Sequence, residues 1–469
     1  MKPKTPNLDT VTTINEDGSR FFIHPADVKG KWMRWRRLTA LVLIGIYILL
    51  PWIPVNGYPA VFLDVMERRF HLFGFTLAAQ DAWLLFFFVS GLAFLLFYVT
   101  AFLGRVWCGW ACPQTVFLEH VYRRVERWID GDAAARKRLD RTPMNPAKMR
   151  KRVLKHGIFL LLSAVIAHIF LSYFISIPQL WEWMRLSPLE HWQAFLFVLI
   201  STALLYGNFA FFREQLCIII CPYGRFQSAL LDDHTKNVAY DYKRGEPPGP
   251  VKDPEAGDCI DCHRCIQVCP TGIDIRQGIQ LECIGCAACI DACDEIMDKV
   301  KRPRGLIRYA SDAELEGGRT RWIRPRTILY TALLLLGAGV AGFAFTSVEK
   351  ATVTATRMPG SPFYVTGDYV RNQYQVRLIN KAGEDLTFTL ATNREEIPFP
   401  IETSGFAGSV TLSPMEERNT TFVVQVSRDV YEGAFPLEIL VEVEPGGVEM
   451  VEEVEFLGPT PEMLRRQQP

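Results

Sequence analysis

The cysteines are the residues of this chain whose type and spacing most clearly predict chemistry. Eight of the twelve lie between residues 259 and 293, in two runs with the spacing C-x2-C-x2-C-x3-C that are separated by thirteen residues. The runs consist of Cys259, Cys262, Cys265 and Cys269, and of Cys283, Cys286, Cys289 and Cys293. Three thiolates so spaced on a tight loop can hold three corners of one iron–sulfur cube. The doubled spacing therefore predicts two [4Fe–4S] clusters.

The fourth cysteine of each run is expected to serve the other run's cluster. It lies one helical turn beyond the third and points away, as in bacterial two-cluster ferredoxins. The first cluster is accordingly assigned to Cys259, Cys262, Cys265 and Cys293, and the second to Cys283, Cys286, Cys289 and Cys269. One departure concerns local geometry only, because Pro270 follows the first run whereas Asp294 follows the second.

Zinc and disulfide bonds are the alternative uses of so many cysteines. Structural zinc sites need only four ligands and pair C-x2-C units over a longer gap, and the single His263 does not complete a zinc pattern. Disulfides require an oxidising compartment, whereas the topology argued below places these residues in a reducing one. Iron–sulfur clusters are therefore the preferred interpretation.

The other four cysteines form two matching C-x3-C-P units. Cys108 and Cys112 belong to the first unit, and Cys217 and Cys221 to the second. Positions i and i+4 share one face of a helix, and the following proline favours an end or a kink there. Packing of cysteine as a small apolar residue is the alternative, but two identical units at equivalent depth favour a functional site. Such thiols suit Cu(I), zinc or an iron–sulfur centre, or a dithiol–disulfide couple.

Apolar segments must position these cysteines. Hydrophobic residues make up 49% of the 469-residue chain, and its formal net charge of +0 predicts no nucleic-acid partner. The first apolar segment follows a long basic region and has no small-residue cleavage site, so it is expected to be retained rather than removed as a signal peptide. Five transmembrane helices are predicted, over residues 38–55, 82–103, 157–177, 194–212 and 327–345.

Positive charges in the connecting segments predict the orientation. Loop 104–156 holds thirteen Lys and Arg residues, whereas loop 56–81 holds two and loop 178–192 holds one. The positive-inside rule then places the N-terminus and segment 213–326 in the cytoplasm and the C-terminus outside. For the multi-pass protein of the bacterial inner (cytoplasmic) membrane that we expect, outside is the periplasm. The cytoplasm is the reducing compartment in which thiolates persist.

A multi-domain membrane protein is thus expected. Its regions are a cytoplasmic N-terminal segment (1–37), a four-helix transmembrane region with both C-x3-C-P units (38–242), a two-cluster, ferredoxin-like α+β domain (243–300), a basic linker with the fifth helix (301–348), and a periplasmic all-β domain (349–469). In the last region, apolar runs at 376–379, 386–390, 421–426 and 437–443 alternate with turn signals. This pattern suggests an antiparallel, immunoglobulin-like β-sandwich, although the region lacks the Trp and Cys of antibody domains.

His168 is the one candidate inside a predicted membrane span. An intramembrane histidine is a site hypothesis by default. The sequence offers no paired histidine in another span, so an interhelical hydrogen bond is preferred over a haem ligand. The sequence contains no glycine-rich phosphate loop, Rossmann fingerprint or nucleophile–base motif.

Together, the motifs resemble the membrane polyferredoxins of the CcoG/FixG/RdxA type, which are accessory proteins of cbb3-type cytochrome oxidase. The resemblance rests on residues 104–117, residues 213–227, the doubled cysteine run and the order of parts. It implies reduction of Cu(II) to Cu(I), so that the ion can be passed to assembly factors. It also makes Cys108, Cys112, Cys217 and Cys221 candidates to hold or reduce copper.

The leading hypothesis is a membrane electron-transfer protein with two [4Fe–4S] clusters. A cytoplasmic donor would reduce the clusters, which would reduce copper, or a disulfide that handles copper, at the four C-x3-C-P thiols. Copper-handling assembly factors, the cbb3-type oxidase and the membrane are the other expected partners; cupric reductase activity and a homodimeric state are left open. Alternatively, the clusters feed a quinone or a partner redox complex, or the periplasmic domain acts as an assembly scaffold.

Overall fold

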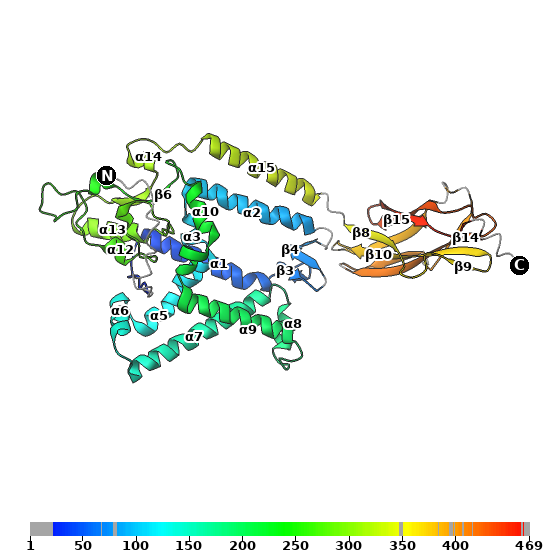
Figure 1. Ribbon diagram of the computed structural model, residues 1–469, viewed down its shortest axis with the longest axis horizontal. Coiled ribbons are helices and arrows are strands. Elements are labelled where there is room, and N and C mark those ends of the chain that lie inside the picture. Colours follow the sequence, from blue (N-terminus) through cyan, green and yellow to red (C-terminus); the bar gives the residue numbers. More distant parts are fainter. Residues whose placement is uncertain are drawn as a thin grey trace. The chain divides into compact units, whose positions relative to one another are not determined.

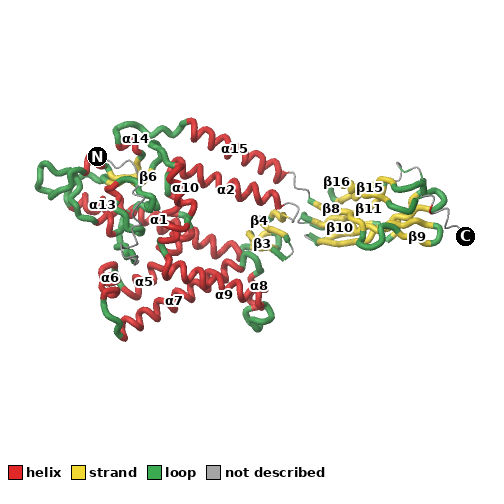
Figure 2. Tube along the Cα trace, viewed as in Figure 1, coloured by secondary structure: helices red, strands yellow, loops and turns green. Residues whose placement is uncertain are grey.

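The computed structural model describes residues 22–66, 68–77, 82–346, 350–382, 384–393, 397, 399–405, 408–414, 416–460 and 463. The chain forms two compact units, which divide between Phe343 and Ala344. The first unit consists mainly of helices with small sheets, and the second consists of β-strands (Figures 1 and 2).

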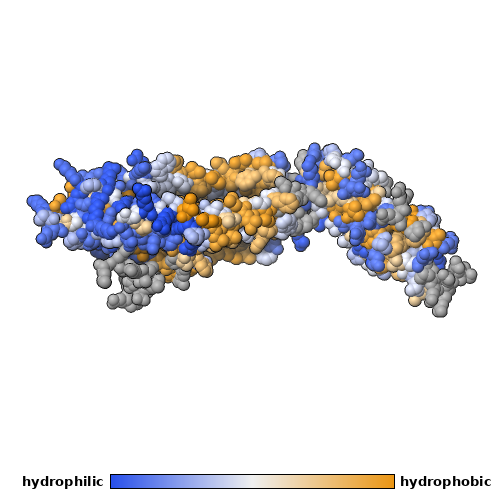
Figure 3. All heavy atoms as spheres, turned by 90° about the horizontal axis from the view of Figure 1, so that it is seen from above, coloured by the Kyte–Doolittle hydropathy of each residue, from blue (hydrophilic) through white to orange (hydrophobic). Residues whose placement is uncertain are grey.

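Five helices in the described part of the chain are long and apolar enough to cross a membrane, as predicted. They are α1 (Lys31–Leu49), α2 (Ala82–Leu103), α7 (Pro146–Leu171), α9 (Trp192–Gly207) with the π-helical turn η4 (Asn208–Phe212), and α15 (Pro325–Thr346). Large apolar side chains such as Leu41, Phe86 and Leu161 are exposed on them, as a lipid environment requires. Figure 3 shows this apolar surface over the helices and a hydrophilic surface over the cysteine-bearing end of the first unit.

Two of these helices begin well before the predicted residue, whereas α9 and α15 each begin only two residues before it. Helix α1 begins at Lys31 rather than Leu38, because Lys and Arg are good helix formers and extend the apolar segment. Helix α7 begins at Pro146 rather than residue 157, because Asn145 accepts a hydrogen bond from the Lys148 amide and Pro146 occupies the first helical position. Both extensions are basic, which hydropathy alone does not include in a span.

Shorter helices connect the spans and build the cysteine-bearing domain. They are α3 (Val106–Trp110), α4 (Pro113–Phe117), η3 (Leu118–Tyr122), α5 (Arg123–Asp130), α6 (Ala133–Arg141), α8 (Ile177–Trp183), η5 (Leu216–Ile220), α10 (Pro222–Leu230), α11 (Tyr242–Gly245), α12 (Arg264–Gln267), α13 (Ala288–Lys299) and α14 (Asp312–Leu315). Strand β6 (Asn237–Tyr240) pairs antiparallel with β7 (Ile307–Ala310) and closes the cysteine-bearing segment at its base. Apolar residues including Val238, Ile290 and Leu306 surround the cysteines there.

Helix α13 also holds the start of the first membrane helix. The Asp291 carboxylate accepts hydrogen bonds from the backbone amides of Trp32 at 3.2 Å and Met33 at 2.7 Å. These amides are among those that the first turn of a helix leaves without partners. A side chain at residue 30 would collide with Asp291, so Gly30 permits this close approach.

A small sheet that the sequence analysis did not predict lies between α1 and α2. Strands β3 (Val61–Asp64), β4 (Arg69–Leu72) and β5 (Phe75–Leu77) form it in that order. Strands β1 (Pro54–Val55) and β2 (Tyr58–Pro59) pair beside it in the chain. Runs of two to four residues are too short to give a clear alternating pattern, which is why sequence periodicity missed them.

The second unit is an antiparallel sandwich, as predicted. One sheet has the order β12-β14-β10-β8, with β9 paired to β10, and the other has the order β13-β11-β15-β16. The strands are β8 (Ala351–Arg357), β9 (Tyr364–Thr366), β10 (Tyr369–Asn380), β11 (Leu386–Thr392), β12 (Ile401–Ser404), β13 (Ser409–Leu412), β14 (Glu417–Ser427), β15 (Phe435–Glu444) and β16 (Val448–Phe456). Val376 and Val424 of the first sheet share a core with Phe388 and Val441 of the second. The four predicted strands lie within β10, β11, β14 and β15.

Candidate functional site

The last cysteine of the first run lies with the first three of the second run. Cys283, Cys286 and Cys289 each interact electrostatically with Cys269. The four thiols line a common small cavity with apolar neighbours that include Val238. These are the four cysteines that the sequence analysis assigned to the second cluster. That they bind a cluster stays a prediction.

The remaining cysteines of the two runs form the other group. Cys293, in the middle of α13, interacts electrostatically with Cys265, Cys262 and Cys259. Of these thiols, Cys259 is buried and Cys262 is exposed. The structure thus brings together the residues predicted for the first cluster, by the predicted exchange of the last cysteine.

The two cysteine loops share a backbone conformation. In each run, the residues before and after the second cysteine have positive φ: Asp261 and His263 at 53° and 52°, and Gly285 and Ala287 at 64° and 62°. Left-handed residues at these matching positions turn the loop tightly and aim successive backbone amides to one side, which suits an anionic centre. The role of His263 is therefore its left-handed backbone conformation, which helps to turn the loop, and Ala287 has the same role in the second run.

Burial controls the protonation of these thiols. It raises the pKa of Cys265, Cys283 and Cys293 to about 12, and that of Cys286 to about 11. The metal-free thiols are therefore protonated at neutral pH. Iron deprotonates a coordinating thiol outright, so cluster insertion releases these protons. The donor set and its apolar surroundings fit iron–sulfur clusters, whose chemistry when bound is one-electron transfer.

The two C-x3-C-P units converge. Cys217 interacts electrostatically with Cys112, Cys108 and Cys221, and Cys108 interacts with Cys112 and Cys221. Burial raises the pKa of Cys108 and of Cys217 to about 12. We call these residues the four-thiol site.

A helix ends at the second cysteine of each unit, as predicted. Cys112 has extended ψ of 125° after α3, and Cys221 has ψ of 108° after η5. Pro113 and Pro222 then begin α4 and α10, at the first helical position where proline is favoured. Each pair of sulfurs therefore lies at a junction between two short helices rather than on one continuous helix.

Buried ion pairs hold the second unit in place, and sequence reasoning missed them. Arg213 pairs with Glu126 of α5 at 2.7 Å, and Glu214 pairs with Arg123 of α5 at 3.0 Å. Gln114 donates a hydrogen bond to the Arg213 carbonyl at 3.0 Å, which joins the second unit to the helix that follows the first. The only available signal was the charged pair Arg213–Glu214 directly before an apolar, cysteine-containing turn.

The second cysteine group abuts the four-thiol site. A Cβ atom on Gly109 would lie 2.5 Å from the Ile284 carbonyl oxygen and 2.9 Å from the Cys286 amide nitrogen. Cys108 packs against the hydrophobic cluster that contains Cys286. Arg105 donates hydrogen bonds to the carbonyls of Leu281 and Cys283. One continuous packed region therefore links the two sets of sulfurs.

Three further observations concern single metal ions, disulfides and His168. Among the residues that it describes, no three His, Cys, Asp or Glu side chains meet in a way that could hold a single metal ion. All twelve cysteines are free, without disulfides. The Nδ1 atom of His168 hydrogen-bonds to the Ala164 carbonyl at 2.7 Å. Both residues belong to α7, so this hydrogen bond lies within one helix, whereas a bond between two helices was predicted for His168.

Comparison with known proteins agrees with this arrangement. Family models match residues 212–312 as a 4Fe-4S dicluster domain, residues 83–131 as a 4Fe-4S binding domain, and residues 341–459 as the IG-like fold at the C-terminal of FixG. The chain is thus similar to iron–sulfur proteins over both cysteine-bearing regions.

Three relatives match over most of their length. Protein RdxA of Cereibacter sphaeroides is 38% identical over 88% of this chain and 90% of its own. Protein RdxB of the same organism is 39% identical, and the match covers 85% of this chain and 87% of RdxB. Nitrogen fixation protein FixG of Rhizobium meliloti is 35% identical, and the match covers 83% of this chain and 82% of FixG. The five apolar helices, the 4Fe-4S domains and this similarity show that the chain belongs to the RdxA and FixG family of membrane iron–sulfur proteins.

Proposed function

We propose that this protein carries electrons from a reduced cytoplasmic donor, through two [4Fe–4S] clusters, to the four-thiol site, where Cu(II) is reduced to Cu(I). The Cu(I) would then be passed to copper-handling factors that assemble cbb3-type cytochrome oxidase. The clusters, which the eight cysteines of the two runs would hold, would supply one electron for each Cu(II) that becomes Cu(I), and the donor would restore that electron. Copper is the substrate here rather than a resident cofactor.

One observation carries this proposal: Cys108 packs against the group of buried apolar side chains that includes Cys286. Electrons need a short, densely packed route between the two sets of sulfurs. Gly109 supplies this by letting the Ile284–Cys286 backbone approach α3 directly. The Arg105 side chain fixes the same loop by donating hydrogen bonds to the backbone carbonyls of Leu281 and Cys283.

The chemistry of the four-thiol site suits Cu(I). Thiolates are soft ligands that favour Cu(I) over Cu(II), so binding at sulfur assists the reduction. Two thiolates suffice for Cu(I), so all four need not hold the ion at once. Alternatively, two of the thiols would form a disulfide with release of two protons while two Cu(II) ions become Cu(I), and two electrons from the clusters with two protons would restore the thiols.

The test uses anaerobically purified protein with reduced clusters. Addition of Cu(II) should oxidise the clusters and deliver Cu(I) to a Cu(I)-specific chelator. The double variant Cys112→Ser/Cys221→Ser should lose this reaction and keep the cluster absorbance, which serves as the control for folding and cluster content. Unchanged copper reduction in the double variant would rule out Cys112 and Cys221 as the thiols that reduce copper.

A quinone is the second candidate for the electron acceptor, and one cavity favours it. A mainly apolar cavity of about 680 Å³ lies among α1, α7 and α9 and reaches Trp107, Ala111 and Pro113 of the first unit. Its volume is typical of small-molecule sites, and Gln114 and Asn208 supply polar groups. A quinone there would take electrons and protons in place of copper.

Filling this cavity separates the two candidates. Leu204→Trp should slow reoxidation of the clusters by a short-chain quinone if that acceptor is used, and leave reoxidation by Cu(II) unchanged. Leu199→Trp is the matched control, because Leu199 is exposed on the same helix and does not line the cavity. If neither variant alters a quinone-dependent rate, the cavity is not the acceptor site.

A further inference from the structure

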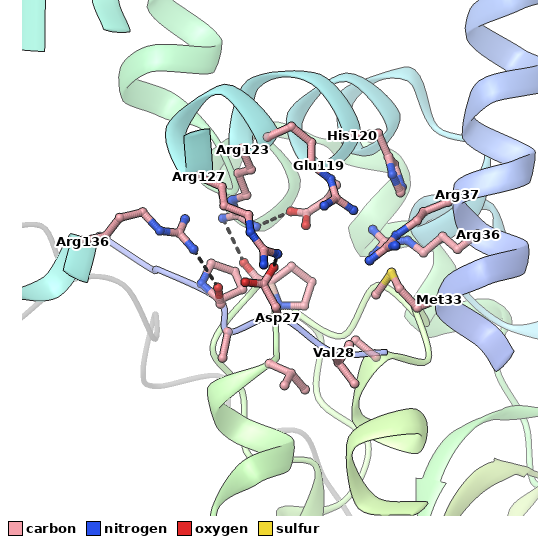
Figure 4. A pocket seen from close by; sticks show the side chains of 16 residues that line it. Asp27, Val28, Met33, Arg36, Arg37, Glu119, His120, Arg123, Arg127 and Arg136 are labelled. Carbon is pink, nitrogen blue, oxygen red and sulfur yellow. Dashed lines mark hydrogen bonds and ion pairs between the residues drawn. The ribbon is translucent and has the colours of Figure 1, made fainter. Parts of the chain in front are cut away.

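An arginine-rich cavity lies beside the second cysteine group, outside the four-thiol site. It has a volume of about 70 Å³ and lies where α1, η3 and α5 meet the loop of the first cysteine run and the start of α13 (Figure 4). Six arginines line it: Arg36, Arg37, Arg123, Arg124, Arg127 and Arg136. Among the described residues that line it, two are carboxylates, Asp27 and Glu119.

The carboxylates do not neutralise all of this charge. Asp27 pairs with Arg127, Glu119 and Glu214 pair with Arg123, and Glu126 lies 3.7 Å from Arg136. Within the described part of the chain, Arg36, Arg37 and Arg124 have no carboxylate within ion-pair distance. Arg37 and Arg124 lie close enough for their charges to repel each other.

Histidine adds no charge to the cavity at neutral pH. Burial lowers the pKa of His120 to about 4, and the charge of Arg36 acts in the same direction. The excess positive charge therefore belongs to the arginines alone. An arginine keeps its charge across the physiological range, so protonation changes cannot relieve the repulsion.

Several buried guanidinium nitrogen atoms in this cavity also lack a hydrogen-bond partner among the described residues. Arg36 is 2% exposed; its Nε atom donates to the Gly109 carbonyl at 2.7 Å, but its Nη2 atom has no partner. The Nε atoms of Arg37 and Arg123 are likewise buried without a partner. Figure 4 shows Arg36 and Arg37 extending from α1 toward the side of the cavity formed by Glu119, His120 and Arg123. A buried donor without an acceptor is unfavourable, so this arrangement is suited to an acceptor that carries negative charge.

We propose that this cavity binds a phosphate-type oxyanion, supplied either by inorganic phosphate or by the headgroup of an anionic lipid. Guanidinium groups bind phosphate oxygens by paired, charge-assisted hydrogen bonds. The cavity holds a few water-sized volumes, which accommodates a tetrahedral oxyanion but not a whole nucleotide. The lipid source is consistent with the position of Arg36 and Arg37 at the start of a membrane-spanning helix.

The site goes beyond the proposed copper chemistry, because it requires no copper. Arg36 is also close enough to act electrostatically on Cys286. A bound anion would offset that positive charge and make the neighbouring cluster harder to reduce. Binding of the anion and reduction of copper can therefore be measured separately, and either can fail without the other.

The experiment uses the full-length protein with its clusters. In detergent, inorganic phosphate is titrated by calorimetry at constant ionic strength, with chloride as the reference anion. In a parallel arm, the protein is placed in nanodiscs of phosphatidylglycerol or of phosphatidylcholine, and the lipid retained after extraction into detergent is counted by native mass spectrometry.

Three variants define the site. Arg37→Gln/Arg124→Gln removes two partly exposed arginines and should weaken binding by at least about tenfold, as expected for losing charged hydrogen bonds. Arg36→Gln removes the buried donor, but it also breaks the bond to Gly109 and can disturb folding. Arg34→Gln is the matched control, because Arg34 is exposed on the same helix and does not line the cavity.

The outcomes are distinct. Saturable phosphate binding that is lost in Arg37→Gln/Arg124→Gln and kept in Arg34→Gln supports the site with free phosphate as the source. Retention of phosphatidylglycerol alone, with the same dependence on these arginines, supports it with lipid as the source. Absence of both, or equal binding by the double variant, overturns the proposal.

Discussion

Cys108 of α3 and Cys286 of the second cysteine run pack in one hydrophobic cluster. The two residues belong to different motifs and lie far apart in the sequence, yet the backbone around Cys286 occupies the space that a side chain on Gly109 would need. This contact joins the iron–sulfur domain to the four-thiol site. Several of the predictions below follow from it.

Gly109→Ala should separate these two segments. The added Cβ would meet the Ile284 carbonyl and the Cys286 amide, so either the loop moves or the protein is destabilised, by about 1–3 kcal/mol for an overpacked site. Stopped-flow oxidation of the reduced clusters by Cu(II) should become slower. Gly157→Ala is the control, because nothing lies within 4 Å of a Cβ there. Equal rates in both variants would show that electrons do not cross at Gly109.

The fourth cysteine of each run is expected to bind the cluster of the other run, and this predicts which cluster is lost when Cys269 or Cys293 is replaced. Cys269→Ala should lower the iron content from about eight to about four per chain and remove the cluster held by Cys283, Cys286 and Cys289. Cys293→Ala should remove the other cluster. Iron analysis with electron paramagnetic resonance of each reduced variant distinguishes the two. If Cys269→Ala instead removes the cluster at Cys259, Cys262 and Cys265, the ligands are not exchanged.

Arg105→Gln should lower the reduction potential of the second cluster. Arg105 is buried, binds the carbonyls of Leu281 and Cys283, and acts electrostatically on the Cys283 thiol. Loss of about 1 kcal/mol of favourable charge interaction corresponds to roughly 40 mV. Arg105→Lys keeps the charge and should retain most of the potential. A redox titration followed by paramagnetic resonance measures this, with the first cluster as the internal reference.

His71 predicts a pH dependence in the small sheet between α1 and α2. It is buried, stacks on Tyr58 with centroids 3.8 Å apart and hydrogen-bonds to Thr76 at 2.8 Å. Burial lowers its pKa from 6.5 to about 4. Between these values the unfolded sheet takes up a proton and the folded sheet does not, so stability falls as the pH decreases from 6.5 to 4.

Amide hydrogen exchange of strands β3 to β5, corrected for intrinsic rates, should show this loss of protection. The dependence should disappear in His71→Gln, which keeps a polar side chain but does not titrate. A His71 ring that titrates near pH 6.5 in nuclear magnetic resonance would contradict the prediction.

The features that could be predicted from the sequence are those with a local signal. Cysteine spacing predicted the two groups, hydropathy predicted the five apolar helices, and alternation predicted four strands of the sandwich. Arg213–Glu126 and Arg123–Glu214 could not be predicted, since each joins residues whose separation follows no helical or strand period. The contact at Gly109 left one weak sign, a glycine beside a motif cysteine, which permits close backbone approach without naming the partner.

Asp291 gives helix α13 a second role. The helix that carries Cys289 and Cys293 also caps the first turn of α1 through the amides of Trp32 and Met33. A displacement of α13 would therefore change two things together, the positions of Cys289 and Cys293 and the cap on the first turn of α1.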